Sequence, residues 1–367
     1  MPVPLQPTAA PPWEMLAALD DVRRAQGALL DAVGLGPLER PHATVFEAPG
    51  VALRRYGTGR EPGARLLLVP APIKRPYIWD LAPGASVVEA CLAARARVFL
   101  VDWRPAPAGF GLADYADRLI GACLDAAGEG ETVLVAHSLG GLFAATYAAL
   151  HPERVRALVL LAAPLHFGGG AGIFDAMVAA LDLGTLPPSI PGSFLSLASF
   201  QASPATFGLE RGLDFAASLA RPDALASHLR VERWTLDEFA LPRRLVADLA
   251  TLAREDRLVR GELAVGARIA APRNVTAPLL CVVDPRCRVV PPEAVLPFVA
   301  AAASADKRVL HYGGDVGVSL QHVGMLVGAS AHARLWPEIL RWIAAHAGGG
   351  RPRRRGAARE PGGRDAA

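Results

Sequence analysis

Long hydrophobic runs, paired cysteines and a recognisable leader are absent from this sequence. No stretch approaches eighteen consecutive apolar residues, although 52% of the 367 residues are hydrophobic, so we expect no membrane span. Met1 to Pro12 has neither the positive segment nor the apolar segment of a signal peptide. The four cysteines form no CxxC pair and no Cys/His spacing typical of a metal site, so we predict reduced thiols in a cytoplasmic protein. They are Cys91, Cys123, Cys281 and Cys287.

An excess of basic charge is also absent from most of the chain. The whole sequence has 38 Lys and Arg residues against 35 Asp and Glu residues. Gly348 to Ala367 holds six arginines against Glu360 and Asp365, which leaves 32 basic and 33 acidic residues before it. We therefore expect no nucleic-acid partner and a disordered Arg-rich tail over residues 348–367. A weak contact of this tail with an anionic surface stays open.

Short apolar runs alternate with helical segments along most of the chain. The pattern predicts strands at Thr44–Tyr56 (early and antiparallel), Leu66–Val69, Val98–Val101, Val133–Ala136, Ala157–Leu161, Leu279–Val283 and Arg308–Tyr312. It predicts helices at Val87–Ala94, Leu112–Ala126, Leu142–Leu150 and Ala331–Ala345. The fold class is therefore α/β, with a doubly wound, mostly parallel sheet and chemistry at the carboxyl ends of its strands.

Two regions depart from this alternation of strands and helices. Between residues 165 and 277 lie a glycine run, several prolines and helical patterns near Pro222–Arg230 and Leu241–Arg254. We predict an inserted helical cap there, between core segments 44–164 and 278–347, with long surface excursions as the alternative. Residues 1–43 form a lead-in with an amphipathic helix, Trp13–Val33, whose apolar residues we expect to pack on the domain rather than on a partner. These residues are Met15, Leu16, Leu19, Val22, Leu29 and Val33.

Ser138 lies where an apolar strand passes directly into a helix of small residues, Leu142–Leu150. This strand–turn–helix order is typical of a nucleophile elbow, in which residues two before and two after the serine must be small. Ala136 and Gly140 occupy those positions, so alanine replaces the usual first glycine. We predict Ser138 as the nucleophile and the Leu139 amide as one oxyanion donor.

A serine hydroxyl needs a base to take its proton and an acid to support that base. With a nucleophile elbow the three residues follow one another in the chain as serine, acid and base. Of nine histidines, His322 follows the last predicted strand and is our candidate base. The acid is expected after the strand Leu279–Val283, four residues before a proline. Counting back from Pro291 leads to Cys287, whose thiol is a weak acceptor. Asp284, at the strand end, is the candidate acid, and the alternative is that it only starts the turn before Pro285.

The second oxyanion donor should come from the loop after Leu66–Val69, which reads Pro70-Ala71-Pro72-Ile73. Proline has no N–H, so Ala71 or Ile73 must donate.

Several stretches together resemble the polyhydroxyalkanoate synthases and related synthase-like α/β hydrolases. They are Leu68–Leu81 (the oxyanion-loop motif), Val98–Arg104, Asp114-Tyr115, Pro191–Leu195, Glu255-Asp256, Gly261, His322–Gly324 and Trp336-Pro337. Three positions depart from that family: Ser138 replaces the synthase cysteine, Cys287 the acid, and His166 a further aspartate. The resemblance implies the α/β-hydrolase fold with a cap and acyl-transfer chemistry.

The expected protein is thus an esterase, thioesterase or acyltransferase that acts on an ester or acyl-CoA-like substrate, with a hydroxyacyl group as the candidate acyl part, without a metal or nucleotide cofactor. A polyester synthase or depolymerase is one alternative. A catalytically silent, granule- or partner-binding subunit is the other, since the acid is missing. A homodimer or association with polyester granules stays open.

Overall fold

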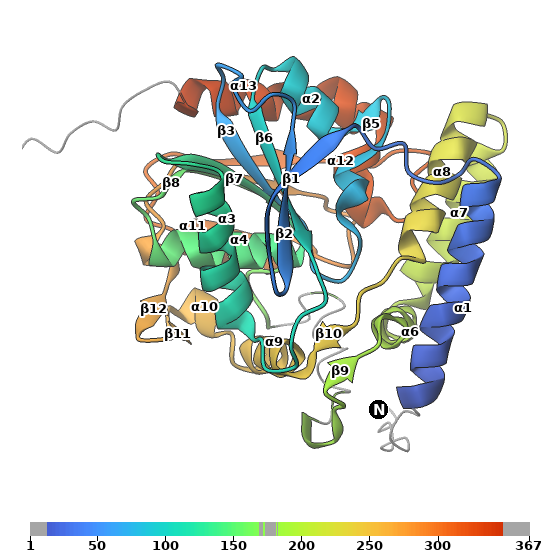
Figure 1. Ribbon diagram of the computed structural model, residues 1–367, viewed down its shortest axis with the longest axis horizontal. Coiled ribbons are helices and arrows are strands. Elements are labelled where there is room, and N and C mark those ends of the chain that lie inside the picture. Colours follow the sequence, from blue (N-terminus) through green and yellow to red (C-terminus); the bar gives the residue numbers. More distant parts are fainter. Residues whose placement is uncertain (1–12, 169–171, 173–180, 182, 348–367) are drawn as a thin grey trace, which may run out of the picture.

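A sheet of eight strands forms the centre of the computed structural model, which describes residues 13–168, 172, 181 and 183–347 (Figure 1). In spatial order the strands are β1 (His42–Ala48), β2 (Val51–Tyr56), β6 (Arg97–Trp103), β3 (Arg65–Val69), β7 (Thr132–His137), β8 (Val155–Leu161), β13 (Leu279–Val283) and β14 (Lys307–His311). From β6 to β14 the neighbours are parallel, whereas β1 and β2 add an antiparallel edge. The predicted α/β fold class is confirmed.

Helices cover both faces of this sheet. The helices α2 (Val87–Ala93) and α13 (Trp336–Ala347) lie on one face, and α3 (Ile120–Ala126) and α4 (Leu139–Leu150) on the other. Every residue of β3, β7 and α4 is buried, as expected of apolar strands packed on both faces and of a helix rich in small residues. The predicted helix over 112–126 begins as a π-helical turn, Asp114–Leu119, and continues as α3. Helices α11 (Leu296–Ala301) and α12 (Gly324–Val327) belong to the second part of the core.

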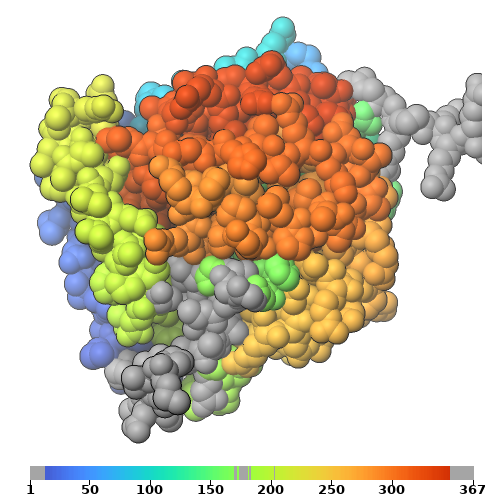
Figure 2. Space-filling model, turned by 180° about the vertical axis from the view of Figure 1, so that it is seen from behind, coloured from blue at the N-terminus to red at the C-terminus, as the bar shows by residue number. Residues whose placement is uncertain are grey.

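Between β8 and β13 the chain leaves the sheet, as the predicted cap requires. Helices α6 (Gly192–Ala202), α7 (Arg211–Ser218) and α8 (Pro222–Thr235) stand beside α1 (Trp13–Ala32) at one side of the molecule (Figure 1). From behind, these helices adjoin the C-terminal part of the core (Figure 2). The later elements α9 (Arg243–Glu255), α10 (Arg257–Arg260), β11 (Leu263–Val265) and β12 (Arg268–Ala270) return to the core, where β12 packs on α4. The short pairs β4 (Asp80–Ala82) with β5 (Ala85–Ser86), and β9 (Ser189–Ile190) with β10 (Leu241–Pro242), complete the strands.

The cap boundaries at 165 and 277 stay a prediction. The expected disordered tail, 348–367, and the first twelve residues lie outside the described residues. No helix in the described ranges is long and apolar enough to cross a membrane.

Helix α1 contacts the protein through polar side chains as well as through Trp13 and Leu16. Asp20 accepts hydrogen bonds from the amides of Gly192 and Ser193 (3.1 and 2.7 Å), and Asp31 pairs with Arg233 (2.7 Å). Of its six predicted core residues only Leu16 is buried, while the other five are 41–71% exposed. The expectation that the apolar face packs on the domain is therefore wrong, because polar contacts hold the opposite side of the helix.

Candidate active site

Ser138 sits in the sharp turn between β7 and α4. Its backbone has φ +55° and ψ −132°, a conformation that costs free energy in a residue with a Cβ atom. The turn is held from both sides: the Ser138 amide donates to the Leu161 carbonyl of β8 (3.0 Å), and the Ser138 carbonyl accepts from the Gly141 amide (2.8 Å). Strain of this kind, fixed by neighbouring elements, is typical of functional sites.

The turn packs closely against the end of β3. A Cβ atom on Gly140 would lie 2.5 Å from the Pro70 carbonyl oxygen and closer still to that of Val69. Ala136, two residues before the serine, is fully buried. The small residues that the sequence pattern required are therefore needed to bring the start of α4 against the predicted oxyanion loop.

His322 lies in a 3-10 turn, Gln321–Val323, in the loop after β14. The neighbouring Gln321 side chain fixes this loop, because its amide nitrogen donates to the carbonyls of Asp315 (2.6 Å) and Val318 (3.0 Å). Its oxygen accepts from the Asp315 amide (3.0 Å). Gly324 packs against the Tyr312 ring, where any side chain would overlap the hydroxyl. The loop thus holds the imidazole in one place.

The imidazole of His322 is 7% exposed, and its two nitrogens have different surroundings. Among the described residues Nε2 has no hydrogen-bond partner, whereas Nδ1 lies 3.5 Å from the Cys287 sulfur. His137 donates from Nε2 to the His322 carbonyl (2.9 Å), and the two rings lie 4.6 Å apart. Burial, with a smaller effect of His137, holds the pKa of His322 well below its usual value, so the ring is neutral at neutral pH.

Asp284 lies at the end of β13, fully buried, but not against His322. Its Oδ1 accepts from the Arg286 amide (2.9 Å), and its carbonyl accepts from the Cys287 amide (3.0 Å). These are the contacts of a residue that starts a turn. Within the described ranges the structure gives Asp284 no hydrogen bond to the His322 ring. The side chain that meets Nδ1 is Cys287, which sequence reasoning had placed at the acid position and discounted as an acid.

Ser138 and His322 line one cavity of about 400 Å³, together with Ala71 and Ile73 of the predicted oxyanion loop. Leu139 is the first residue of α4, and the first amides of a helix have no partner within it. The insertion supplies much of the remaining wall, with apolar side chains such as Phe200, Phe207 and Trp234 beside several polar ones. The predicted serine and histidine, with the oxyanion candidates Ala71 and Ile73, therefore line one largely apolar chamber.

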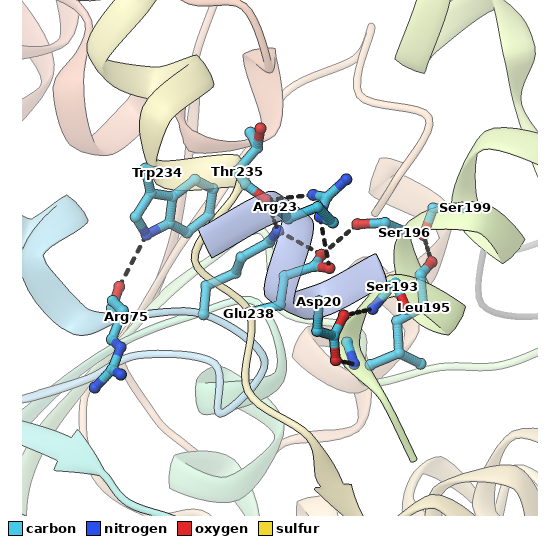
Figure 3. A network of polar contacts seen from close by, with 12 residues as sticks. Asp20, Arg23, Arg75, Ser193, Leu195, Ser196, Ser199, Trp234, Thr235 and Glu238 are labelled. Atoms are coloured by element: carbon cyan, nitrogen blue, oxygen red, sulfur yellow. Dashed lines mark hydrogen bonds and ion pairs between the residues drawn. The ribbon is translucent and has the colours of Figure 1, made fainter. Parts of the chain in front are cut away.

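A buried polar network links this chamber to α1 (Figure 3). Lys74 follows the oxyanion loop and donates to Glu238 Oε1 (2.6 Å) and to the Thr235 carbonyl. Arg23 of α1 donates to the same carbonyl (2.7 Å) and lies 3.4 Å from Glu238 Oε2, which places Glu238 between two cations. Ser196 also donates to Glu238. Burial lowers the pKa of Lys74, against the opposing effect of Glu238.

Sequence reasoning missed this network and the role of His137. His137 directly precedes the nucleophile, which was a usable signal, whereas nothing local relates Arg23, Lys74 and Glu238. His166, noted as a departure, pairs with Asp256 (2.7 Å), and neither residue is among those that line the cavity of Ser138. In the part of the chain that the structure describes, no group of His, Cys, Asp and Glu side chains could hold a metal ion.

Known proteins resemble this chain in sequence over most of its length. A family model described as the alpha/beta hydrolase fold matches residues 77–203. The poly(3-hydroxyalkanoate) polymerase subunit PhaC of Haloarcula marismortui is 26% identical over 344 residues, which cover 88% of this chain and 70% of that protein. The same-named protein of Allochromatium vinosum is 26% identical over 333 residues, or 86% of this chain and 91% of that protein.

Solved structures agree on the fold. A monoacylglycerol lipase of Paleococcus ferrophilus superimposes with a TM-score of 0.50 and is 18% identical in sequence. The match covers 81% of this chain and 99% of the lipase chain. An alpha/beta hydrolase fold protein of Nakamurella multipartita has a TM-score of 0.51 and 22% identity, covering 84% and 100%. The protein therefore has the α/β-hydrolase fold, and its sequence is similar to those of polyhydroxyalkanoate synthases over nearly the whole chain.

Proposed function

We propose that this protein is a serine-dependent acyl-transfer enzyme whose reacting pair is Ser138 and His322. The observation that carries the proposal is their meeting at one cavity, with the serine in a strained elbow and, among the described residues, no hydrogen-bond partner at His322 Nε2. Its substrate is an ester or acyl thioester, and the acyl group passes to water or to an alcohol.

In the first step Nε2 of His322 takes the proton of the Ser138 hydroxyl as Oγ attacks the acyl carbonyl. The negative charge on the carbonyl oxygen is stabilised by the Leu139 amide and by the amide of Ala71 or Ile73. The same Nε2 proton passes to the leaving alcohol or thiol, which leaves an acyl-serine. Water or an alcohol, deprotonated by His322, then releases the acyl group and restores the serine.

The apolar chamber supports an acyl group as the part of the substrate that is enclosed. The relatives named as poly(3-hydroxyalkanoate) polymerase subunits support a hydroxyacyl group and action on a polyester, by synthesis or by cleavage. Cytoplasmic location and association with polyester granules belong to the same proposal.

One observation favours a second candidate, a catalytically silent subunit. The neutral thiol of Cys287 stands at His322 Nδ1, where a carboxylate would stabilise the imidazolium that forms during transfer. Burial raises the pKa of this thiol to about 11, so it carries no charge near neutral pH. The first candidate keeps precedence because Ser138, His322 and the loop residues Ala71 and Ile73 line one cavity, and Leu139 directly follows the serine at the start of α4.

A fluorophosphonate probe separates the two candidates, because it labels only a serine that a base activates. We expect the wild type to be labelled and Ser138→Ala to be unlabelled. His322→Ala should reduce labelling strongly, since the base is lost. Ser304→Ala is the matched control and should be labelled like the wild type, because this serine only donates to the Asp306 carbonyl. Unlabelled wild-type protein with a normal melting transition would establish the silent subunit instead.

A further inference from the structure

The loop that leads from β14 to the turn of His322, residues 312–320, is held by the core near both of its ends. Near its start, Asp315 accepts a hydrogen bond from the Tyr312 hydroxyl (2.8 Å). Beyond its end, the Gln321 side chain donates to two carbonyls of the same loop. The position of the imidazole therefore depends also on what holds the middle of this loop.

The middle of the loop is held by the insertion. The Gly317 amide donates to Oδ1 of Asp214 on α7 (3.0 Å). Gly317 is buried with φ +89°, and a Cβ atom there would lie 2.7 Å from the Ala224 carbonyl oxygen of α8. The loop thus lies directly against α7 and α8, at the boundary between insertion and core that Figure 2 shows from behind, and this close approach requires glycine.

The carboxylate that holds Gly317 is itself fixed by a histidine. Nδ1 of His228 on α8 donates to Oδ2 of Asp214 (2.7 Å). The two side chains are only 4% and 9% exposed. A buried carboxylate needs hydrogen-bond donors in place of water. The imidazole and the Gly317 amide supply one donor to each oxygen, which fixes the orientation of the carboxylate.

This pair is connected to the wall of the cavity but is not part of it. Nε2 of His228 lies 3.9 Å from Oε1 of Glu232, and Nε of Arg211 donates to the same oxygen (2.9 Å). Arg211 lines the cavity of the candidate active site, whereas Asp214 and His228 are not among its lining residues. A row of polar contacts therefore runs from the cavity wall through α8 to the loop.

A shift of Gly317 would be passed on to the base over a short path. The next residue, Val318, accepts from the Gln321 side chain through its carbonyl (3.0 Å), and His322 follows Gln321 directly. Misplacement of a catalytic group by about 1 Å can cost ~10²-fold in rate.

We infer that Asp214 and His228 are positioning residues for His322, which they place by holding Gly317. The inference rests on the proposed role of His322 as the base. It gives the insertion a second task besides enclosing the substrate, because the base is in place only when α7 and α8 are seated on its loop.

The first test is hydrogen–deuterium exchange of the full chain, which needs no active enzyme. Asp214→Ala should accelerate exchange of the amides of residues 318–323, beyond Gly317 itself, by about 10-fold or more. Asp214→Asn keeps an oxygen for the Gly317 amide and should exchange like the wild type. Asp223→Ala is the matched control, because Asp223 is exposed in the first turn of α8. Unchanged exchange of residues 318–323 in Asp214→Ala would overturn the inference.

The second test is hydrolysis of a chromogenic acyl ester, which separates positioning from packing. Asp214→Ala should lower kcat about 10-fold with KM unchanged, because the loop shifts while the cavity wall stays. Asp214→Asn should restore kcat, since the loop is held again. His228→Ala leaves the carboxylate in place and should lower kcat by a smaller factor. It replaces Asp214→Ala if that variant does not fold.

The two tests distinguish failure of this inference from failure of the proposed function. An active wild type with an equally active Asp214→Ala variant would refute the positioning role alone. A raised KM at constant kcat would do the same, because the pair would then shape the cavity and not the base. A wild type inactive toward the ester and unlabelled by the fluorophosphonate probe would refute the proposed function, and the exchange of residues 318–323 alone would then decide whether the pair holds the loop.

Discussion

The hydrogen bond between Cys287 and His322 determines which nitrogen of the imidazole carries the proton. The thiol is neutral and already accepts a hydrogen bond from the Val290 amide (3.4 Å), so it remains free to donate S–H to His322 Nδ1. If the thiol donates, the imidazole proton stays on Nε2 and the ring has no lone pair toward Ser138. If Nδ1–H donates to sulfur, Nε2 is free to act as a base. A carboxylate would permit only the second arrangement.

Replacing Cys287 by aspartate should therefore increase turnover. We expect Cys287→Asp to raise kcat/KM about 100-fold, within the ~10⁴ that an aspartate contributes in chymotrypsin. Ester hydrolysis with a chromogenic acyl substrate measures the change. Cys287→Ser is the matched control and should remain slow, because a hydroxyl is neutral like the thiol.

Asp284 is close enough to Cys287 to raise its pKa, so a second carboxylate there meets repulsion. Cys287→Asp/Asp284→Asn should be at least as active as the single aspartate variant. The single variant Asp284→Asn should retain full turnover if Asp284 serves the turn alone. A large loss in Asp284→Asn would restore it as the acid and contradict the contacts described above.

At the scale of elements, the sequence predicted best what is local in the chain. The strand β7, the elbow and α4 are consecutive, so a periodic pattern and two small residues were enough to place Ser138. The side of α1 that faces the protein could not be predicted, because Asp20 and Arg23 find their partners more than 150 residues away. Cys287 at Nδ1 depends on the shape of the loop after β13, and hydrophobic patterning does not encode that shape. The periodicity in α1 was genuine, but it marked a largely exposed side of the helix rather than a buried face.

The pair Lys74 and Glu238 joins the oxyanion loop to the insertion, and both side chains are largely buried, at 15% and 3% exposure. Glu238→Gln should lower the free energy of unfolding by about 3 kcal/mol, because it leaves a buried ammonium without its anion. Lys74→Met/Glu238→Gln should recover part of that loss, since the buried ammonium is gone while Arg23 still lacks the carboxylate. Denaturant unfolding of the two single variants and the double variant measures the coupling.

An exposed pair provides the comparison. Arg154 and Asp125 form an ion pair with 35% and 71% exposure. A double-mutant cycle on Arg154 and Asp125 should give a coupling energy below about 1 kcal/mol, as is usual for ion pairs in water. Equal couplings for the two pairs would mean that burial does not strengthen the Lys74–Glu238 contact.

At the scale of the whole molecule, the site exists only when both parts of the core are assembled. His137 ends β7 in the first part, and His322 follows β14 in the second, 185 residues later. Each histidine is buried and neutral in the folded state, and the two rings lie against each other. Protonation of either ring therefore opposes the closure of the core around the cavity.

This arrangement makes the stability of the protein depend on pH in a defined direction. Burial lowers the pKa of His137 to about 4, against about 6.5 in an unfolded chain, so on acidification the unfolded state binds the proton first. The stabilisation that comes from keeping His137 neutral is complete above pH ~6.5 and is lost as the pH falls toward the pKa of the folded state. For His137 this loss of stability amounts to about 3 kcal/mol. In His137→Gln, whose amide keeps a donor for the His322 carbonyl, the loss between about pH 7 and pH 4 should shrink by about that amount. Urea unfolding at stepped pH measures it, and parallel profiles for the two proteins would show that His137 does not carry the pH dependence.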